Sequence, residues 1–157
     1  MMVLPFIVRS TRLALPVEQI VRVLPMLPVD KVGQTPDFIR GAVNLFGRSM
    51  MVLDMASRLG WPPSTLSPWQ PFIWVMQEPF EALLSVDHVD LVCDISLPNT
   101  RETRFDDWPE ALIKHMVPCQ DSLLFISDIN ALLTSNEVTQ CQHWLQQTQP
   151  QQTSPRS

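Results

Sequence analysis

The chain is poor in long apolar runs, in cysteine and in glycine, and each shortage narrows what the protein can be. No apolar stretch reaches the roughly 18 residues that a membrane-spanning helix needs, so we expect no insertion into a membrane. The first basic residue is Arg9, which follows only a short apolar run, so the N-terminus does not resemble a secretory signal peptide. These features favour a cytoplasmic protein.

Residue types that would build a disulfide framework or a metal site are also scarce. The three cysteines are Cys93, Cys119 and Cys141, and the three histidines are His88, His115 and His143. The cysteines are odd in number and widely spaced, which excludes a disulfide framework and fits a reducing compartment. Neither residue type has the spacing of zinc ligands, so we expect no metal and no other cofactor. The net charge of −5 and the scattered basic residues argue against a nucleic-acid partner.

Two of the 4 glycines bracket one short apolar strand. Gly41 and Gly47 flank residues 42–46, where backbone freedom is needed at both ends of the strand. The continuous apolar run over 50–53 is typical of a strand that is buried on both faces. Asp54 follows this run and has the character of a helix N-cap, so the sequence predicts strand, turn, strand and a short helical turn.

This unit recurs later in the chain, as does the one before it. At a shift of 74 positions, Val43 falls on Val117, Met51-Val52 on Phe125-Ile126, and Asp54 on Asp128. At a shift of 69, Ala14-Leu15 falls on Leu83-Leu84 and Ile20 on Val89. Residues 5–7 also resemble residues 71–73. Collinear matches of this kind predict two similar halves in the same internal order.

The pattern of short strands and frequent turn signals predicts an all-β fold. Strands are expected over 3–8, 13–15, 20–24, 42–46, 50–53, 72–76, 80–85, 91–95, 112–119 and 123–126. With about five strands in each half, two small barrels packed together would hide the edges that such short sheets otherwise expose. We expect one lobe over about 3–60 and a second over about 71–135.

The segments outside these strands have compositions of their own. The proline-rich stretch 60–71 is the expected boundary between the lobes, and the charged stretch 99–110 is an expected loop. A C-terminal helix is predicted over 136–148, with Val138, Cys141 and Leu145 facing inward. The remaining residues, 149–157, are rich in glutamine, proline and serine and are expected to be disordered.

Three segments together resemble the CheW family of chemotaxis adaptors. Residues 13–21 (LALPVEQIV) are similar to the family pattern ALPVxxVxxV. Residues 38–47 (FIRGAVNLFG), followed by 51–55 (MVLDM), are similar to its central motif around NLRG and VVDL. Residues 123–129 (LLFISDI) are similar to its terminal step LLLDL. The resemblance covers most of residues 3–134 and assigns residues 1–135 to one CheW-like domain.

The resemblance implies two five-stranded barrels of the Src-homology-3-like kind and a scaffold without catalytic activity. It implies a bridge between the cytoplasmic tip of a chemoreceptor and the regulatory domain of a CheA-type histidine kinase. Carried over by position, Arg22, Asn44 and Phe46 would face the receptor. Arg40 and Gly41 would face the kinase. Phe46 stands where the family has the arginine of NLRG, and Arg22 stands where its partner glutamate often sits, so that ion pair cannot form.

Several readings remain open at this stage. Phe46 is either an interface anchor or a packed barrel residue. Asp54 and Asp128 are far more typical of helix caps than of an acid–base pair. The protein is either an ordinary coupling adaptor or a divergent one, which serves a pilus or surface-motility pathway or competes with the ordinary adaptor. A small-molecule-binding or enzymatic β-barrel is the alternative from another class, and converging titratable groups in a polar pocket would favour it.

Overall fold

A computed structural model describes residues 1–31, 33, 35–62, 69–96, 113–119 and 122–148. The loop predicted over 99–110 and the tail predicted over 149–157 lie outside the described residues, as does much of the proline-rich boundary. Within the described part, no helix has the length and apolar character needed to cross a bilayer.

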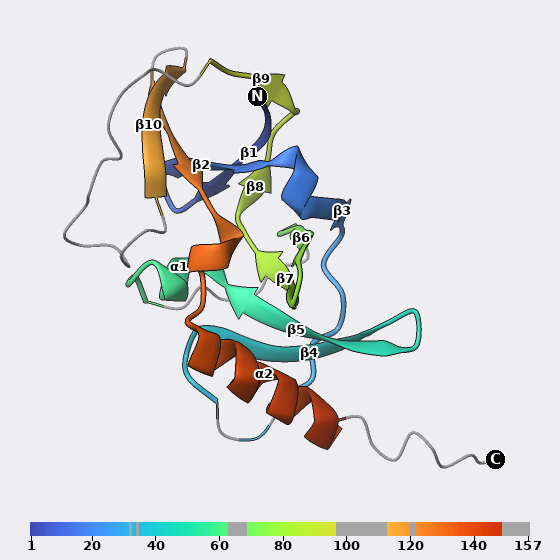
Figure 1. The fold of residues 1–157 in the computed structure, drawn as a ribbon. Coiled ribbons are helices and arrows are strands. Elements are labelled where there is room, and N and C mark those ends of the chain that lie inside the picture. The colour runs from blue at the N-terminus through green and yellow to red at the C-terminus, as the bar shows by residue number, and fades with distance from the viewer. Residues whose placement is uncertain (32, 34, 63–68, 97–112, 120–121, 149–157) are drawn as a thin grey trace.

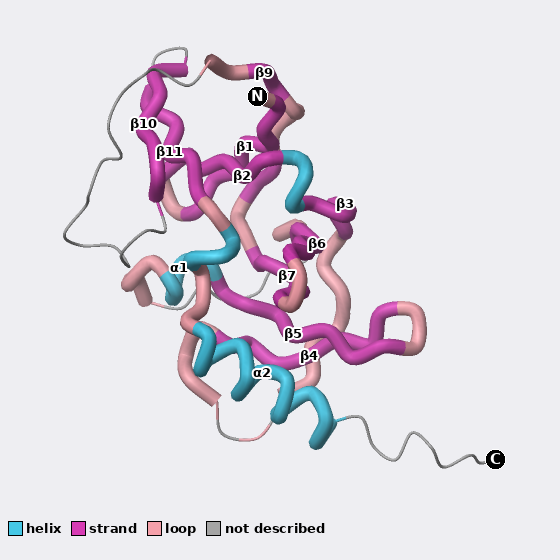
Figure 2. The backbone as a smooth tube through the Cα atoms, viewed as in Figure 1, coloured by secondary structure: helices cyan, strands magenta, loops and turns pink. Residues whose placement is uncertain are grey.

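Short strands dominate the described chain (Figures 1 and 2). The first hairpin and the strands of the central unit are β1 (Met2–Val8), β2 (Thr11–Pro16), β3 (Ile20–Leu24), β4 (Ile39–Leu45) and β5 (Arg48–Asp54). The later strands are β6 (Phe72–Gln77), β7 (Phe80–Ser85), β8 (His88–Val89), β9 (Cys93–Asp94), β10 (Ile113–Cys119) and β11 (Ser122–Ser127). The helical segments are η1 (Val17–Gln19), α1 (Met55–Arg58), η2 (Ile129–Ala131) and α2 (Ser135–Thr148). The predicted all-β class and C-terminal helix are therefore confirmed.

One predicted strand, over 91–95, is correct only at Cys93–Asp94, which form β9. The chain instead forms β8 and β9, which pair with β1 on either side of an unpaired stretch that includes Leu91 and Val92. Pro5 lies opposite this stretch in β1, and Asp90 donates its backbone N–H to the Pro5 carbonyl at 2.9 Å. Because proline has no N–H to return to the ladder, pairing is interrupted there and the opposing chain bulges outward.

The strands form two sheets that exchange hairpins between the halves of the chain. One sheet has the order β3-β6-β7-β5-β4, and the other has the order β10-β11-β2-β1-β8, with β9 also pairing with β1. The β6–β7 hairpin thus sits among first-half strands, and the β1–β2 hairpin sits among second-half strands. The lobes predicted over 3–60 and 71–135 follow the sequence repeat. They do not coincide with the two sheets, because each sheet combines strands from both halves of the chain.

The strand registers show how closely the two sheets correspond. The parallel pair Val52↔Leu83 in one sheet matches Ile126↔Ala14 in the other, at the predicted shifts of 74 and 69. Likewise, Ile20↔Val75 matches Val89↔Phe6. The register therefore makes Val75 the equivalent of Phe6, so the similarity between residues 5–7 and 71–73 is not a structural equivalence.

Each sheet has a core of its own, and a third core joins the sheets. The core of the five-stranded sheet is built from Leu24, Val43, Leu45, Met50, Val52, Phe72 and Leu83. The core of the six-stranded sheet is built from Val3, Ala14, Ile95, Val117, Leu124 and Ile126. Met51 and Leu53 point the other way, into the large cluster shared by both sheets, which confirms that the run over 50–53 is buried on both faces.

Candidate functional site

The turn between β4 and β5 presents an exposed aromatic residue in an unfavourable backbone conformation. The strands pair up to Leu45↔Arg48, which leaves Phe46 and Gly47 as a two-residue turn with φ values of 53° and 84°. Such turns need positive φ at both positions and favour Asn-Gly, because a bulky residue with a Cβ is strained there. The Gly47 N–H donates to Asn44 Oδ1 at 3.0 Å and supports the turn. Phe46 is 76% exposed, so it is not a packed barrel residue.

Strand β3 presents a second exposed apolar surface. Three consecutive residues of this strand are exposed: Val21, Arg22 and Val23. The apolar side chains of Val21 and Val23 are 46% and 39% exposed to solvent. β3 lies at one margin of its sheet, and among the described strands it pairs only with β6, where Arg22 stands opposite Trp74. β4, which leads to Phe46, lies at the other end of the strand order. The described structure shows no hydrogen bond or ion pair between Arg22 and Phe46 or Asn44.

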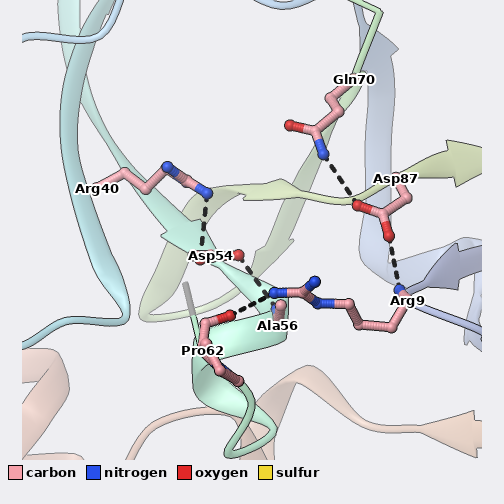
Figure 3. A network of polar contacts seen from close by, with 7 residues as sticks. All are labelled: Arg9, Arg40, Asp54, Ala56, Pro62, Gln70 and Asp87. Atoms are coloured by element: carbon pink, nitrogen blue, oxygen red, sulfur yellow. Dashed lines mark hydrogen bonds and ion pairs between the residues drawn. The ribbon is translucent and has the colours of Figure 1, made fainter. Parts of the chain in front are cut away.

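Arg40 and Asp54 form an ion pair beside the start of α1 (Figure 3). Arg40 Nη2 lies 3.2 Å from Asp54 Oδ2, and the two side chains are 14% and 2% exposed. Asp54 Oδ1 accepts from the Ala56 N–H at 3.2 Å, which is the N-cap contact expected of this residue. The equivalent Asp128 Oδ1 accepts from the Asn130 N–H at 2.9 Å at the start of η2. Both carboxylates are thus engaged at helix starts and lie on different sheets.

Gly41 lies beneath the segment that follows β3. Its φ is +143°, and a Cβ added there would stand 2.1 Å from the Asp30 carbonyl oxygen. That oxygen accepts from the Ala42 N–H at 2.8 Å, and the Asp30 N–H donates back to the Ala42 carbonyl at 2.9 Å. The missing side chain of Gly41 therefore lets this bridge form against the outer side of β4. Lys31, which follows the bridge residue Asp30, and Asp37, which precedes β4, are both exposed.

Sequence reasoning missed a polar network around Asp87 (Figure 3). Asp87 Oδ2 accepts from the Arg9 N–H at 2.6 Å, and its Oδ1 accepts from Gln70 Nε2 at 2.9 Å. Arg9 also donates from Nη2 to the Pro62 carbonyl at 2.6 Å. Pro62 and Gln70 belong to the two described parts of the 60–71 segment, and these bonds connect both parts to the β1–β2 turn. At the shift of 69, Asp87 falls on Glu18, but that match alone does not indicate a polar network.

Helix α2 is fastened at its start by a reciprocal pair of hydrogen bonds. The Thr134 N–H donates to Glu137 Oε1 at 2.8 Å, and the Glu137 N–H donates to Thr134 Oγ1 at 3.1 Å, which is a capping box. Arg58 pairs with the same Glu137 oxygen at 3.2 Å, stacks on the Phe38 ring, and donates to the Leu132 carbonyl. Helix α2 is thereby tied to α1 and η2.

A cavity of about 390 Å³ lies between α2 and strands β5 and β7. Its lining includes Met51, Phe80, Val138 and Leu145, and the Arg48–Glu81 ion pair, 2.8 Å long, also lines it. The buried Cys141 thiol faces it too, and burial raises the pKa of that thiol to about 11. In the described part of the chain, no three metal-ligating side chains come together.

Comparison with known proteins gives a family and a fold. The family model of the CheW-like domain matches residues 2–137. Among solved structures, the chain is similar to the scaffolding protein TtCheW from Thermoanaerobacter tengcongensis, with a TM-score of 0.76 and 23% identity over 86% of this chain and 88% of that one. No curated protein matches the sequence. The fold is therefore the pair of Src-homology-3-like barrels, and the chain belongs to the family of CheW-like scaffold domains.

Proposed function

We propose that this protein is a coupling adaptor in a chemotaxis-type pathway, which bridges the cytoplasmic tip of a chemoreceptor and the regulatory domain of a CheA-type histidine kinase. It would act in the cytoplasm and carry out no catalysis. The observation that carries the proposal is Phe46, which is 76% exposed on a strained turn of a CheW-like domain. Folding alone gives no reason for a large apolar side chain at that position.

The receptor side is assigned to Phe46, Asn44 and Arg22. Burying a phenylalanine against a partner contributes about 1.5–3 kcal/mol, which offsets the strain of the turn only in the complex. The exposed valines of β3, Val21 and Val23, lie next to Arg22 and give that part of the assigned receptor side an apolar character as well. A helical partner with an apolar stripe fits both features better than an acidic or basic one.

The kinase side is assigned to the region of Arg40 and Gly41. Because Gly41 is buried and Arg40 is paired with Asp54, these two residues would act by holding β4 and the Asp30 bridge in place. Direct contacts would then come from exposed charged residues of the two segments that meet at the bridge, Lys31 after Asp30 and Asp37 before β4. Charge reversal at both, with Lys31→Glu and Asp37→Lys, should weaken binding to a purified CheA-type regulatory domain about tenfold. Gln140→Glu, on the exposed side of α2, is the matched control, and equal losses in both proteins would refute the assignment.

The departures at Arg22 and Phe46 favour a diverged member of the family. Such a member would serve its own receptor or a pilus or surface-motility kinase, or it would compete with the ordinary adaptor. Loss of a charge-assisted contact costs on the order of 1.5–3 kcal/mol, and 1.4 kcal/mol is already tenfold in affinity. The wild-type protein should thus bind an ordinary receptor tip at least tenfold more weakly than a form with the family residues.

The test restores the family residues with Arg22→Glu plus Phe46→Arg. Both proteins are titrated with a receptor signalling-tip fragment, and circular dichroism checks that both are folded. Tighter binding by the restored form supports the diverged receptor side. Equal affinity before and after restoration defeats it.

A further inference from the structure

Cys93 and Cys119 both pack against the core of the six-stranded sheet. Cys93 lies on β9 and Cys119 ends β10, and these strands occupy opposite margins of the strand order. Both side chains are partly buried and pack against the same core cluster. Strand β9 and the carboxyl end of β10 also lie at the same end of the molecule (Figure 1). The two margins of the sheet thus each contribute one thiol to the same core cluster.

The internal repeat relates Cys93 and Cys119 to two equivalent positions in the five-stranded sheet. At the shifts set by the strand registers, 69 and 74, Cys93 corresponds to Leu24 and Cys119 to Leu45. Leu24 and Leu45 are both members of the core of the five-stranded sheet. The same two places in the fold are thus held by leucines in one sheet and by thiols in the other.

The electrostatics of Cys93 agree with this proximity. Burial raises its pKa, and the neighbouring Cys119 raises the pKa further, while Arg12 opposes both by lowering it. Asp94 and Asp90 also raise it. The effect of Cys119 on the pKa of Cys93 is consistent with two thiols that pack against one core cluster.

We propose that Cys93 and Cys119 are a redox pair whose disulfide joins β9 to β10 and closes the margins of the six-stranded sheet. The oxidant is a low-molecular-weight disulfide such as glutathione disulfide. One thiolate attacks the glutathione disulfide, forms a mixed disulfide and releases one glutathione thiolate. The other protein thiolate then attacks the protein sulfur of the mixed disulfide and releases the second glutathione. Two protein thiols are oxidised and one disulfide is reduced to two thiols, so electrons and protons balance.

The test incubates the full chain with mixtures of oxidised and reduced glutathione, followed by acid quenching and peptide mapping. Cleavage by trypsin and Asp-N places the three cysteines on different peptides, because Lys114 and Asp121 flank Cys119 and Asp90 and Asp94 flank Cys93. We expect an intramolecular Cys93–Cys119 link that reductant reverses, with Cys141 still reduced. Closing this loop should raise Tm by roughly 5–10 °C.

Three variants sharpen the result. Cys141→Ser keeps both thiols of the pair and should still show the link and the shift in Tm. Cys93→Ser and Cys119→Ser should each lose both. Separate glutathionylation of Cys93 and Cys119, or links that form only between two molecules, would overturn the proposal. The oxidised and reduced wild-type proteins give this answer without any variant, so a variant that fails to fold does not prevent the test. The pair lies on the other sheet from Phe46 and stands apart from the adaptor proposal.

Discussion

Phe46 has a backbone conformation that its side chain makes costly, and the side chain gains little from the folded protein in return. Asparagine tolerates positive φ and is favoured before glycine in such turns, so Phe46→Asn should raise the free energy of unfolding by about 0.5–1 kcal/mol. The same change should weaken binding of the receptor-side partner at least tenfold, because the apolar anchor is lost. Urea denaturation and titration with the partner measure the two effects. A destabilised variant would show that the ring packs on this chain after all.

Gly41 and Gly47 form a matched pair of glycines with positive φ and different surroundings. A Cβ at Gly41 meets the Asp30 carbonyl carbon at 2.9 Å and its oxygen closer still, whereas nothing lies within 4 Å of one at Gly47. Gly41→Ala should therefore cost about 2–4 kcal/mol, from strain plus the lost Asp30 bridge. Gly47→Ala should cost only about 1 kcal/mol, from backbone strain alone. Chemical denaturation of both variants checks the difference, and equal costs would contradict the clash at Asp30.

The Cys141 thiol should make the free energy of unfolding depend on pH in the alkaline range. The pKa of its thiol rises from an ordinary 9.0 to about 11 in the folded protein, chiefly because of burial and secondarily because of Glu137. Between these values the unfolded chain loses the proton first, so the free energy of unfolding should fall as pH rises from 9 to 11. The chain contains no tyrosine to titrate in the same range. Cys141→Ala should show a shallower decline in pH-dependent denaturation, and an unchanged slope would rule out this thiol as the cause.

Individual residues were predictable only where the local pattern determines their contacts. The capping positions of Asp54 and Asp128 follow from an aspartate placed after a buried strand. Gly41 and Arg40 were assigned to a partner surface, but Gly41 contacts the Asp30 segment and Arg40 pairs with Asp54. Nothing in the sequence shows that a segment about ten residues upstream of Gly41 folds back across it.

At the scale of the element, the start of α2 offers a specific test. The Thr134 hydroxyl and the Glu137 carboxylate satisfy each other's backbone N–H groups. Thr134→Ala removes one of these bonds and should destabilise the helix by about 1 kcal/mol, with faster amide exchange along residues 135–141. Gln140→Ala, at an exposed position of the same helix, is the control and should leave exchange unchanged. Equal exchange in both variants would mean that the capping box does not stabilise α2 and that its other contacts hold it.

Elements were predictable wherever apolar periodicity and turn signals agree. The bounds of β3 and β7 match the predicted ranges, because prolines and polar residues punctuate both sides. The strand predicted over 91–95 is shortened to Cys93–Asp94 for a non-local reason. Its pairing depends on Pro5 in a distant strand, which has no N–H to offer the ladder. The sequence of a strand does not indicate which residues of a distant strand will lie opposite it.

At the scale of the whole molecule, the exchange of hairpins could not be read from the repeat. The β1–β2 and β6–β7 hairpins are similar in sequence. The repeat therefore aligns the same pairs of residues whether each hairpin packs with its own half of the chain or with the other half. Side-chain volume distinguishes the two arrangements. Phe72 and Leu83 fill the core of the five-stranded sheet, and the equivalent positions in the six-stranded sheet hold Val3 and Ala14. A hairpin kept by its own half would bring the wrong volume to both cores.

This mismatch predicts how fragments of the chain behave. In a fragment of residues 1–62, the β1–β2 hairpin would have to replace β6–β7, leaving Ala14 where Leu83 belongs and Val3 where Phe72 belongs. Leucine-to-alanine truncation in a core costs about 2–5 kcal/mol by itself, which is much of the stability of a small domain. The fragment should therefore show no cooperative thermal transition, and residues 69–157 alone should behave likewise. Mixing the two fragments should restore the circular dichroism spectrum and a cooperative transition. Cooperative unfolding of residues 1–62 alone would show that the hairpins are interchangeable and that core volume does not enforce the exchange.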